Sequence, residues 1–335
     1  MSLLSIEDLR VGFSTLDGEV EAVAGISFEL DRGRILGVVG ESGSGKTVSA
    51  LSVLRLLPPS ARVLGGRITF DGEDLTTLPE RRMREIRGKR IGMVFQDPTT
   101  ALNPVLRIGD QIEEALELHN SSMSRREMRR RTVETLELVG VPDPGRRARQ
   151  YPHQWSGGMR QRAVIAMALV NDPDLLLADE PTTALDATVQ AQVLQVIADA
   201  RDSRGCAVML ITHDLGIVAD HADDVVVMYA GRIAEACTAD TLFGAGGEGS
   251  RHPYARALMS SRPGWTDEND RLRPIPGRPP DLLAPPAGCP FHPRCTESAD
   301  DPRCTGELPP LADLGGGHRT ACHRHDRLAP LEVTR

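Results

Sequence analysis

One eight-residue segment restricts the possible folds of this 335-residue chain more than any other. Residues 40–47 read Gly-Glu-Ser-Gly-Ser-Gly-Lys-Thr, with an apolar run at residues 34–39 before them and an expected helix at residues 48–57 after them. A glycine loop between a strand and a helix, ending in Lys and Thr, is typical of phosphate-binding loops. Lysine occurs only at positions 46 and 89 among 39 Lys and Arg residues, so a chance match is rare. The segment therefore indicates a nucleotide site rather than a glycine turn of purely structural role.

The residues of this loop have distinct expected roles. The backbone N–H groups of residues 40–47 and the N-terminus of the following helix cradle phosphates, because both present unpaired donors to an anion. Lys46 reaches the β- and γ-phosphates, and the Thr47 hydroxyl is a ligand for Mg²⁺. The predicted phosphate-binding residues are Gly40, Glu41, Ser42, Gly43, Ser44, Gly45, Lys46 and Thr47.

An acidic motif follows an apolar strand at residues 175–178. Asp179 and Glu180 stand at the end of this strand, and α/β proteins bind their ligands at that edge of a parallel sheet. In a phosphate-loop ATPase the first carboxylate holds Mg²⁺ and the second orients the attacking water. A core strand with a polar exit is the alternative, and it would be the better interpretation if the glycine loop were absent.

The composition excludes several classes of protein. With 47 Asp and Glu against 39 Lys and Arg, the formal net charge is −8, which argues against a general nucleic-acid binder because such proteins present a basic face to phosphates. The apolar runs are much shorter than the roughly 18 residues that a bilayer requires. The first eight residues lack the basic start and apolar core of a secretory signal. We therefore expect a cytosolic protein that binds no nucleic acid and does not itself span a membrane.

The order of the expected elements predicts an α/β fold. Strands alternate with helices over the first 240 residues, as in a mainly parallel sheet covered by helices. Residues 103–150 are polar, rich in arginine and without strand signals, so we expect a helical insertion whose arginine cluster at residues 125–131 is a solvated helix face. The expected strands are residues 6–11, 22–30, 34–39, 67–70, 91–95, 175–178, 207–212 and 225–229, with later helices near residues 187–204 and 214–222.

The composition changes near residue 250. From Gly244 the chain is rich in glycine and proline, and 14 of the 24 prolines lie from Pro253 onward. We therefore predict an α/β domain at residues 1–243, with a helical subdomain at about residues 99–170, and a small irregular extension at residues 244–335 that contains cysteines.

Four further motifs carry a family resemblance. Residues 154–162, Gln-Trp-Ser-Gly-Gly-Met-Arg-Gln-Arg, resemble the signature motif of ABC ATPases. Residues 91–98 resemble the Q-loop of that family, residues 183–186 its D-loop, and residues 211–214 its switch histidine. The chain thus resembles an ABC ATPase from its N-terminus to about residue 240, and the resemblance implies the phosphate-loop ABC ATPase fold.

The resemblance implies roles for individual residues. Glu180 would polarise the attacking water, and Gln96 would sense Mg²⁺ and that water. Phe13 occupies the position of an aromatic residue that stacks on adenine, although a single Phe in a strand is more often part of a core. The implied catalytic residues are Glu180, Gln96, His213, which would contact the γ-phosphate, and Asp186, which would link two ATP sites across a dimer. The implied Mg²⁺ ligands are Thr47, Gln96 and Asp179.

The signature residues Ser156, Gly157 and Gly158 precede an apolar helix at residues 163–170. Small residues at a helix N-terminus expose N–H groups to an anion, and the alternative is that Ser156 simply caps this helix. In the family this helix faces the ATP of a second subunit, so that two nucleotides are held between two ATPase domains. Trp155 departs from the Leu or Phe that is more common in the family, which concerns packing rather than chemistry.

The C-terminal extension carries a second resemblance. Residues 252–258, His-Pro-Tyr-Ala-Arg-Ala-Leu, read as a helix start with proline in its first turn. They resemble the extension of the oligopeptide and dipeptide importer ATPases, as do residues 288–295, 308–311 and 321–323. Four of the six cysteines lie in this extension, namely Cys289, Cys295, Cys304 and Cys322.

The four cysteines of the extension suggest a bound metal ion or cluster. Their spacing matches neither the close pairs of common zinc modules nor a ferredoxin run. A proline-rich segment has little hydrophobic core of its own and needs a cross-link, which we call a staple, to hold it together. Disulfides are rare in the cytosol, so they are not the expected cross-link. Four thiolates suit an iron–sulfur cluster or zinc, and the resemblance favours a four-iron cluster. Unliganded thiols are a third alternative, and zinc stays open because of His292, His318, His323 and His325.

The two other cysteines have a simpler interpretation. Cys206 and Cys237 each stand alone near an apolar run. We expect both to be small core residues.

Together the resemblances imply the ATP-binding subunit of a peptide-class ABC importer. Such a subunit closes on ATP with a copy or a paralogue and moves a membrane permease, which receives substrate from an extracytoplasmic binding protein. We expect it at the cytoplasmic face of the membrane, as a peripheral protein that takes ATP, Mg²⁺ and an iron–sulfur cluster. The alternatives are an importer ATPase for nickel or another small solute, a soluble ABC ATPase acting on DNA, ribosomes or cluster assembly, and a redox- or metal-sensing regulator.

Overall fold

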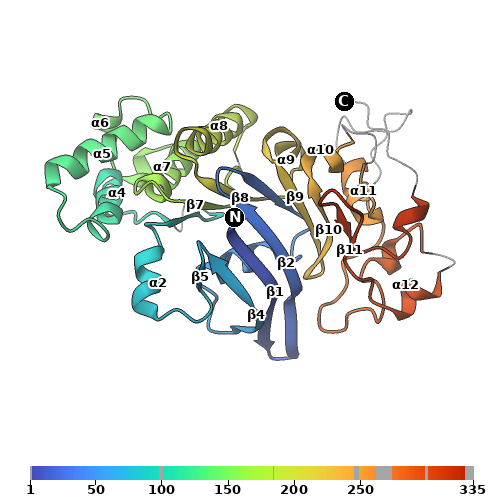
Figure 1. Ribbon diagram of the computed structural model, residues 1–335. Coiled ribbons are helices and arrows are strands. Elements are labelled where there is room, and N and C mark those ends of the chain that lie inside the picture. The colour runs from blue at the N-terminus through green and yellow to red at the C-terminus, as the bar shows by residue number, and fades with distance from the viewer. Residues whose placement is uncertain are drawn as a thin grey trace. The chain divides into compact units, whose positions relative to one another are not determined.

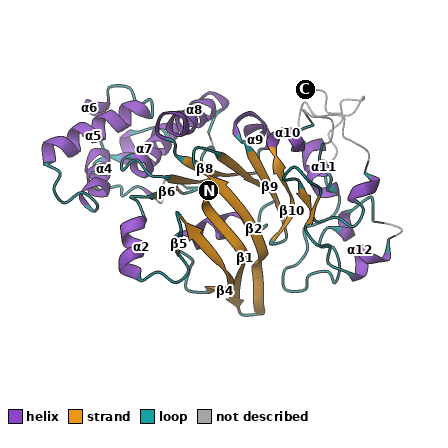
Figure 2. Ribbon diagram, viewed as in Figure 1, coloured by secondary structure: helices purple, strands orange, loops and turns teal. Residues whose placement is uncertain are grey.

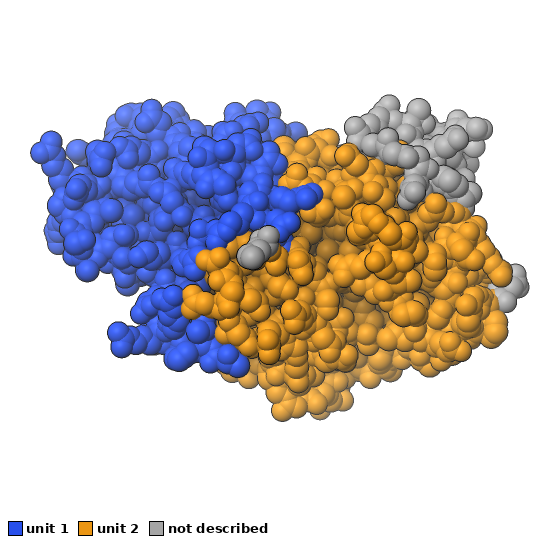
Figure 3. Space-filling view, viewed as in Figure 1, with its two compact units in different colours: residues 1, 30–35, 77–211 blue, residues 2–29, 36–76, 212–335 orange. Residues whose placement is uncertain are grey.

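The computed structural model describes residues 2–97, 101–183, 185–244, 249–261, 274–298 and 301–328. These residues form two compact units (Figure 3). Unit 1 comprises Leu30–Ile35 and Thr77–Ile211, and unit 2 comprises Ser2–Glu29, Leu36–Thr76 and Thr212–Arg335. Within the described ranges, no helix combines the length and the apolar character needed to cross a membrane.

Unit 2 begins with an antiparallel sheet (Figures 1 and 2). Its strands are β1 (Ser2–Thr15), β2 (Gly18–Asp31), β4 (Ala61–Phe70) and β5 (Glu73–Asp74), in the order β2-β1-β4-β5. β1 runs antiparallel to β4, with Leu4 opposite Phe70 and Phe13 opposite Ala61. The strands predicted at residues 6–11 and 22–30 are confirmed but longer, because only a two-residue turn separates β1 from β2.

A second sheet in unit 2 leads into the phosphate-binding loop. β3 (Ile35–Val39) runs parallel to β9 (Asp224–Tyr229), and β9 is antiparallel to β10 (Arg232–Thr238). The C-terminal extension continues this sheet, because β12 (Arg319–Thr320) pairs with β10 and β11 (Ala312–Asp313) pairs with β12. The described helices of unit 2 are α1 (Lys46–Val53), α9 (Leu215–His221), α10 (Ala239–Leu242), α11 (Pro253–Ser260) and α12 (Pro302–Gly306), with 3-10 turns at His292–Arg294 and His325–Arg327.

Unit 1 contains a parallel sheet and the helical insertion. β6 (Ile91–Val94), β7 (Leu175–Asp179) and β8 (Ala207–Thr212) pair in parallel, and β7 is buried at every position, which accounts for its continuous apolar run. The helices predicted in the insertion are confirmed (Figure 1). The described helices of unit 1 are α2 (Glu80–Ile86), α4 (Ile108–Glu117), α5 (Arg125–Leu138), α6 (Pro144–Arg147), α7 (Gly157–Leu169) and α8 (Ala187–Arg204), with a 3-10 turn at Pro152–Gln154.

The arginine-rich helix α5 carries a solvated face, as predicted, except at Arg131, which is 25% exposed and pairs with Asp172. Ser124 begins it with a capping box, in which the Ser124 Oγ accepts from the Glu127 N–H and Glu127 Oε2 accepts from the Ser124 N–H at 2.9 Å. The side chains of Arg129 and Arg130 are 72% and 70% exposed, whereas Met128 is buried. The arginine face is therefore available to solvent, with apolar contacts confined to the opposite side of the helix.

The extension has more core than its composition suggests. Tyr254 of α11 and Phe291 are buried against Tyr229 at the end of β9. The ring centroids lie 4.5 Å apart for Tyr229 and Tyr254 and 5.3 Å apart for Tyr229 and Phe291. Because three aromatic rings bury a large apolar area, the extension packs onto the strand framework of unit 2. The domain boundary predicted at residue 243 stays a prediction. The two compact units are defined by contacts between residues, and their boundaries lie elsewhere in the chain.

The sequence patterns do not predict β10, because a charged residue lies in the middle of it. Glu235 is fully buried. Its Oε2 accepts from Ser250 Oγ at 2.6 Å, and its Oε1 accepts from the Arg251 N–H at 2.5 Å and from His318 Nε2 at 2.8 Å. A buried carboxylate needs such donors to offset the loss of water. Glu235 therefore ties two separate segments of the extension to β10.

We expect Glu235→Ala to lower the free energy of unfolding by about 3 kcal/mol, because it leaves the donors of Ser250, Arg251 and His318 buried without an acceptor. Chemical denaturation followed by circular dichroism measures this loss. Glu307→Ala, at an exposed position of the same extension, is the matched control and should change the value by less than about 0.5 kcal/mol. A loss in Glu235→Ala no larger than that of the control would contradict the proposed role of the buried carboxylate.

Candidate functional site

The phosphate-binding loop lies between β3 and α1 in unit 2. Helix α1 begins at Lys46, after Gly45 at φ 101°. A Cβ on Gly40, at φ 153°, would lie 2.1 Å from the Met228 carbonyl oxygen, and one on Gly45 would lie 2.6 Å from the Ala22 carbonyl oxygen. No side chain fits at either end of the loop, so both glycines of the motif are required by close backbone contacts. The strand, loop and helix predicted from the sequence are confirmed, although α1 ends at Val53 rather than at residue 57.

Lys46 lies on the inside of this loop. Its side chain is buried, and its Nζ donates to the Gly40 carbonyl at 2.7 Å and to the Glu41 carbonyl at 2.9 Å. A lysine in this position brings a positive charge to the loop that also presents the N-terminal amides of α1. Thr47 follows in the first turn of α1 and is exposed. The loop therefore combines a cation, helix amides and a hydroxyl, as phosphate and Mg²⁺ binding require.

The acidic motif lies at the end of β7 in unit 1. Asp179 is the last residue of β7 and is 2% exposed. Glu180 comes next, and its Oε2 accepts from Gln96 Nε2 at 3.3 Å and from Thr183 Oγ1 at 2.8 Å. The structure thus brings Gln96 and Glu180 together, although 84 residues separate them. Two neutral donors orient a carboxylate without consuming its negative charge, which suits a group that must bind water.

The signature residues begin helix α7. Ser156 is its N-cap and accepts from the Met159 N–H at 3.4 Å, so the capping role is observed. A Cβ on Gly158 would lie 2.7 Å from Val189 Cγ1, whereas a Cβ on Gly157 would meet nothing within 4 Å. Trp155 is buried. Gly158 is therefore needed for packing on α8, and Gly157 leaves the start of α7 accessible to a ligand.

Three predicted residues occupy positions with other local features. Asp186 is the N-cap of α8, where Oδ1 accepts from the N–H groups of Thr188 and Val189. His213 is exposed between β8 and α9. Phe13 lies in β1 and is only partly buried, so it is not a full core residue. Position 184 of the predicted D-loop and position 98 of the predicted Q-loop lie outside the described residues.

The predicted Mg²⁺ ligands come from both units. Thr47 belongs to unit 2, and Asp179 and Gln96 belong to unit 1. Their hydroxyl, carboxylate and amide oxygens are the hard ligands that Mg²⁺ prefers. By ligand type, these residues therefore suit the ion.

The four cysteines of the extension line one cavity in unit 2. The space between them is about 20 Å³, and His292 and His323 also line it. Burial is the main cause of the raised pKa of Cys289, about 11, and of Cys322, about 12, and the neighbouring thiols raise both further. All four are free thiols. Within the described ranges, no group of three or more His, Cys, Asp or Glu side chains is arranged to hold a single metal ion.

The two remaining cysteines are core residues, as predicted. Cys206 and Cys237 are 2% and 5% exposed. Burial raises the pKa of Cys206 to about 12 and raises that of Cys237 as well. Neither thiol ionises at neutral pH, and this agrees with a packing role.

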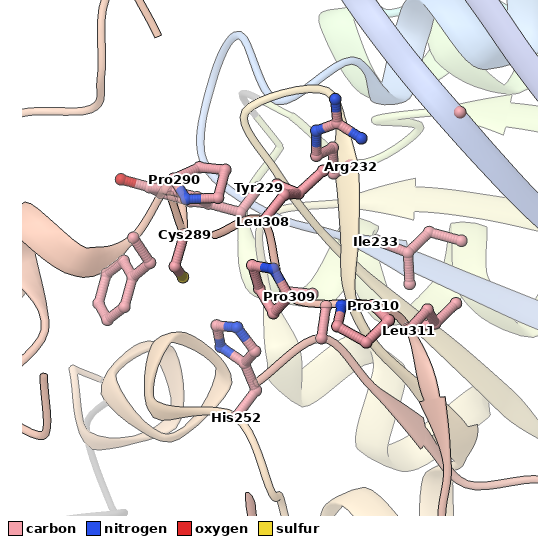
Figure 4. Close-up of a pocket in the computed structure, with 14 residues that line it drawn as sticks. Tyr229, Arg232, Ile233, His252, Cys289, Pro290, Leu308, Pro309, Pro310 and Leu311 are labelled. Carbon is pink, nitrogen blue, oxygen red and sulfur yellow. The ribbon is translucent and has the colours of Figure 1, made fainter. Parts of the chain in front are cut away.

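A larger cavity is also lined by Cys289, one of the four cysteines (Figure 4). It encloses about 200 Å³ and is lined mainly by apolar groups, among them Ile233, Phe291 and the segment 308–311. His252 also lines it, and burial lowers the pKa of that imidazole to about 4, so it is neutral at physiological pH. Its Nδ1 accepts from the Tyr254 N–H at 3.0 Å and thereby caps α11.

Two residues to which the sequence motifs assign no role, Arg294 and Tyr254, reach the phosphate-binding loop. Arg294, between Cys289 and Cys295, makes an ion pair with Glu41, and the Tyr254 hydroxyl accepts from the Glu41 N–H at 2.8 Å. More than 200 residues separate these partners. No local pattern distinguishes Arg294 from the other arginines of the chain.

Comparisons with known proteins give a consistent family. A model of the ABC transporter family matches residues 23–183, and a model of the oligopeptide/dipeptide transporter C-terminal region matches residues 235–304. The dipeptide transport ATP-binding protein DppD of Bacillus subtilis is 52% identical over 88% of this chain and 86% of its own length. A probable peptide ABC transporter ATP-binding protein of Sinorhizobium fredii, y4tR, is 48% identical over 98% of this chain and 97% of its own.

Solved structures agree with this result. The ATP-binding cassette MJ0796, described as a dimer in a post-hydrolysis state bound to ADP and Pi, aligns with a TM-score of 0.64 at 26% identity, over 70% of this chain and 98% of its own. The matched fold and the matched extension together account for both parts of the sequence. The chain belongs to the ATP-binding proteins of the oligopeptide/dipeptide ABC importer family and is an ABC-type ATPase.

Proposed function

We propose that this chain hydrolyses ATP to power the import of peptides through a membrane permease. The observation that carries the proposal is the match of one chain to both the ABC transporter model and the peptide-transporter C-terminal region, with close relatives named for dipeptide and oligopeptide transport. Its partners would be permease subunits, a second ATPase subunit and, indirectly, an extracytoplasmic binding protein. It would work at the cytoplasmic face of the membrane. Import of nickel or another small solute is the competing assignment.

The residues of the ATP site have defined roles in this proposal. Lys46 and the loop amides would bind the phosphates. Thr47, Asp179 and Gln96 would hold Mg²⁺, which would supply positive charge to the phosphate oxygens. Glu180 accepts the proton of the attacking water. Its hydrogen bonds to Gln96 and Thr183 support this role, because they fix the carboxylate in one orientation.

Other predicted residues act on the nucleotide or across the dimer. His213 contacts the γ-phosphate, Phe13 stacks on adenine, and Asp186 links the two ATP sites. The exposure of His213 and the partial exposure of Phe13 are compatible with ligand contact. Ser156, Gly157 and Gly158 present the start of α7 to the ATP of the partner subunit.

We expect Glu180→Gln to lower ATP turnover by at least about a hundredfold and to preserve ATP binding, because it removes the base and leaves residues 40–47 intact. The measurement is ATP hydrolysis and uptake of labelled dipeptide in vesicles that contain the whole importer. Lys46→Ala is the contrasting variant and should lose ATP binding itself, because it removes the cation of the loop.

Two outcomes would contradict these assignments. Wild-type turnover in Glu180→Gln would exclude Glu180 as the base, and wild-type ATP affinity in Lys46→Ala would exclude the loop as the phosphate site. In the same vesicles, ATP-dependent uptake of nickel without uptake of dipeptide would replace peptide by metal as the substrate.

Gly157→Asp should leave ATP binding by the isolated chain unchanged and lower hydrolysis in the assembled importer by about a hundredfold, because the added carboxylate would face the partner's phosphates. The side chain has open space, so the fold should persist. Gly306→Asp, at another open glycine, is the matched control for an added charge and should hydrolyse ATP normally. Loss of ATP binding by the isolated, folded Gly157→Asp chain would show that the signature does not act across a dimer.

We further propose that Cys289, Cys295, Cys304 and Cys322 hold an iron–sulfur cluster. The support for this proposal is that the four thiols line one cavity, because cysteine thiolates are the usual ligands of iron–sulfur clusters. Because the space between them is small, the side chains would turn outward when the cluster binds. The cluster would cross-link segments of the extension that are distant in sequence.

Protein purified without oxygen should be brown and contain iron and sulfide, because sulfur-to-iron charge transfer absorbs visible light and zinc thiolates do not. Loading should weaken as the pH falls, since the metal displaces protons from thiols whose pKa values are raised. Cys304→Ser should remove the colour and expose the extension to protease, while ATP binding persists. Cys206→Ser is the control and should stay brown. Colourless protein with stoichiometric zinc would replace iron by zinc, and unchanged protease resistance after removal of all four thiols would exclude a staple.

A further inference from the structure

Every polar group of Glu41 in the phosphate-binding loop is held by a neighbour within unit 2. Its N–H donates to the Tyr254 hydroxyl at 2.8 Å, and its carbonyl accepts from Lys46 Nζ at 2.9 Å. Its carboxylate accepts hydrogen bonds from both terminal nitrogens of Arg294. NH1 donates to Oε2 at 2.6 Å, and NH2 donates to Oε1 at 2.9 Å. Two of these three contacts come from the C-terminal extension.

The ion pair between Arg294 and Glu41 is bidentate and largely removed from solvent. The side chain of Arg294 is 4% exposed and that of Glu41 is 24% exposed. Charge-assisted bonds of this two-point form are stronger and more directional than single bonds between neutral groups. The ion pair therefore fixes the position of the Glu41 side chain, which a solvent-exposed ion pair would not do.

Arg294 is itself held rigidly. Its Nε donates to the Pro276 carbonyl at 2.8 Å, and NH1 also donates to the Tyr229 hydroxyl at 3.2 Å. The guanidinium lies 5.9 Å from the ring centroid of Phe291. The bonds to Glu41 raise the pKa of Arg294 further above its ordinary value, so the charge is permanent. An arginine with this many contacts has lost its side-chain freedom before any ligand binds.

The negative charge of Glu41 is unfavourable in a loop that binds anions. An unpaired carboxylate next to Gly40 and Lys46 would repel phosphate oxygens and compete for the lysine. Arg294 compensates this charge, and Tyr254 holds the backbone of the same residue. Both effects favour a loop that is already shaped for phosphate.

We propose that Arg294 is a positioning residue of the phosphate-binding loop, through which the C-terminal extension sets the affinity of the chain for ATP. The proposal rests on the assignment of residues 40–47 as the ATP site. Arg294 would not touch the nucleotide; it acts through Glu41. It also ends the 3-10 turn His292–Arg294, between Cys289 and Cys295, so the same short segment serves the cysteine cavity and the loop.

The test measures the dissociation constant of ATP for the full-length chain with Arg294→Met. We expect an about tenfold loss of affinity, because the variant leaves the Glu41 carboxylate uncompensated beside the phosphates. Arg294→Lys keeps the charge without the two-point fork and should lose about threefold. The double variant Glu41→Gln with Arg294→Met should bind ATP more tightly than Arg294→Met alone, since no unpaired charge is left.

The matched control is Arg303→Met. Arg303 forms an ion pair with Asp301 in the same extension. Its variant should bind ATP as the wild type does. An equal loss in Arg303→Met and Arg294→Met would overturn the proposal, because the effect would then come from general disorder of the extension. Additive losses in the double variant would overturn it as well.

Two further measurements keep the test decisive. If the extension is no longer ordered in Arg294→Met, the affinity for ATP is measured instead in Arg294→Lys and in Tyr254→Phe. Both variants keep the aromatic packing. Wild-type affinity for ATP in both of them would overturn the proposal. Lys46→Ala separates this proposal from the assignment of the site. If Lys46→Ala still binds ATP normally, the site assignment fails; if it loses ATP while the Arg294 variants bind normally, only the positioning role fails.

Discussion

The contact of strand backbones with the two end glycines of the phosphate-binding loop is the constraint on which the rest of unit 2 depends. The Met228 carbonyl of β9 blocks any side chain at Gly40, and the Ala22 carbonyl of β2 does so at Gly45. The N–H of Gly231, in the turn that joins β9 to β10, also donates to the Ser44 carbonyl at 3.1 Å. The loop therefore takes its shape from two strands that are far apart in the sequence, β2 and β9, and a change in either strand would alter the loop directly.

The C-terminal extension is part of the same framework. It adds β12 to β10, packs Tyr254 and Phe291 on Tyr229, and supplies three donors to the buried Glu235. The ionic and aromatic contacts are of different kinds. The aromatic rings add buried apolar surface. The carboxylate instead restricts which segments can lie beside β10, because its charge stays buried and needs donors from residues 250, 251 and 318. Support of the loop by Arg294 follows from this arrangement, since the packing of Phe291 on Tyr229 holds the segment that carries Arg294.

The sequence predicts local features well and distant contacts poorly. The glycine loop, the helical insertion and the buried strand at residues 175–178 were predictable, because spacing and apolar runs within a short window determine them. β10 was not, because its buried Glu235 is explained only by donors from residues 250, 251 and 318. The Glu41 and Arg294 pair was hidden for the same reason. Its partners lie 253 positions apart, and the local sequence around Arg294 does not indicate that a carboxylate pairs with it.

The predicted site residues also differ in how much they contribute to the stability of the fold. Substitution of a residue that contributes little to stability gives the clearer test of a chemical role. Ser156 and Asp186 each cap a helix, so their loss would lower stability whatever their part in activity. Glu180 has φ 46°, a left-handed backbone that a residue with a side chain adopts only at a cost of about 1 kcal/mol. Its N–H donates to the Ile211 carbonyl at 2.9 Å, and its carboxylate is held by Gln96 and Thr183. A glycine would relieve the backbone strain there, and yet the chain has a glutamate. The strain is tolerated because the sheet and two side chains hold one orientation of one carboxylate, which is the property that a base acting on water needs.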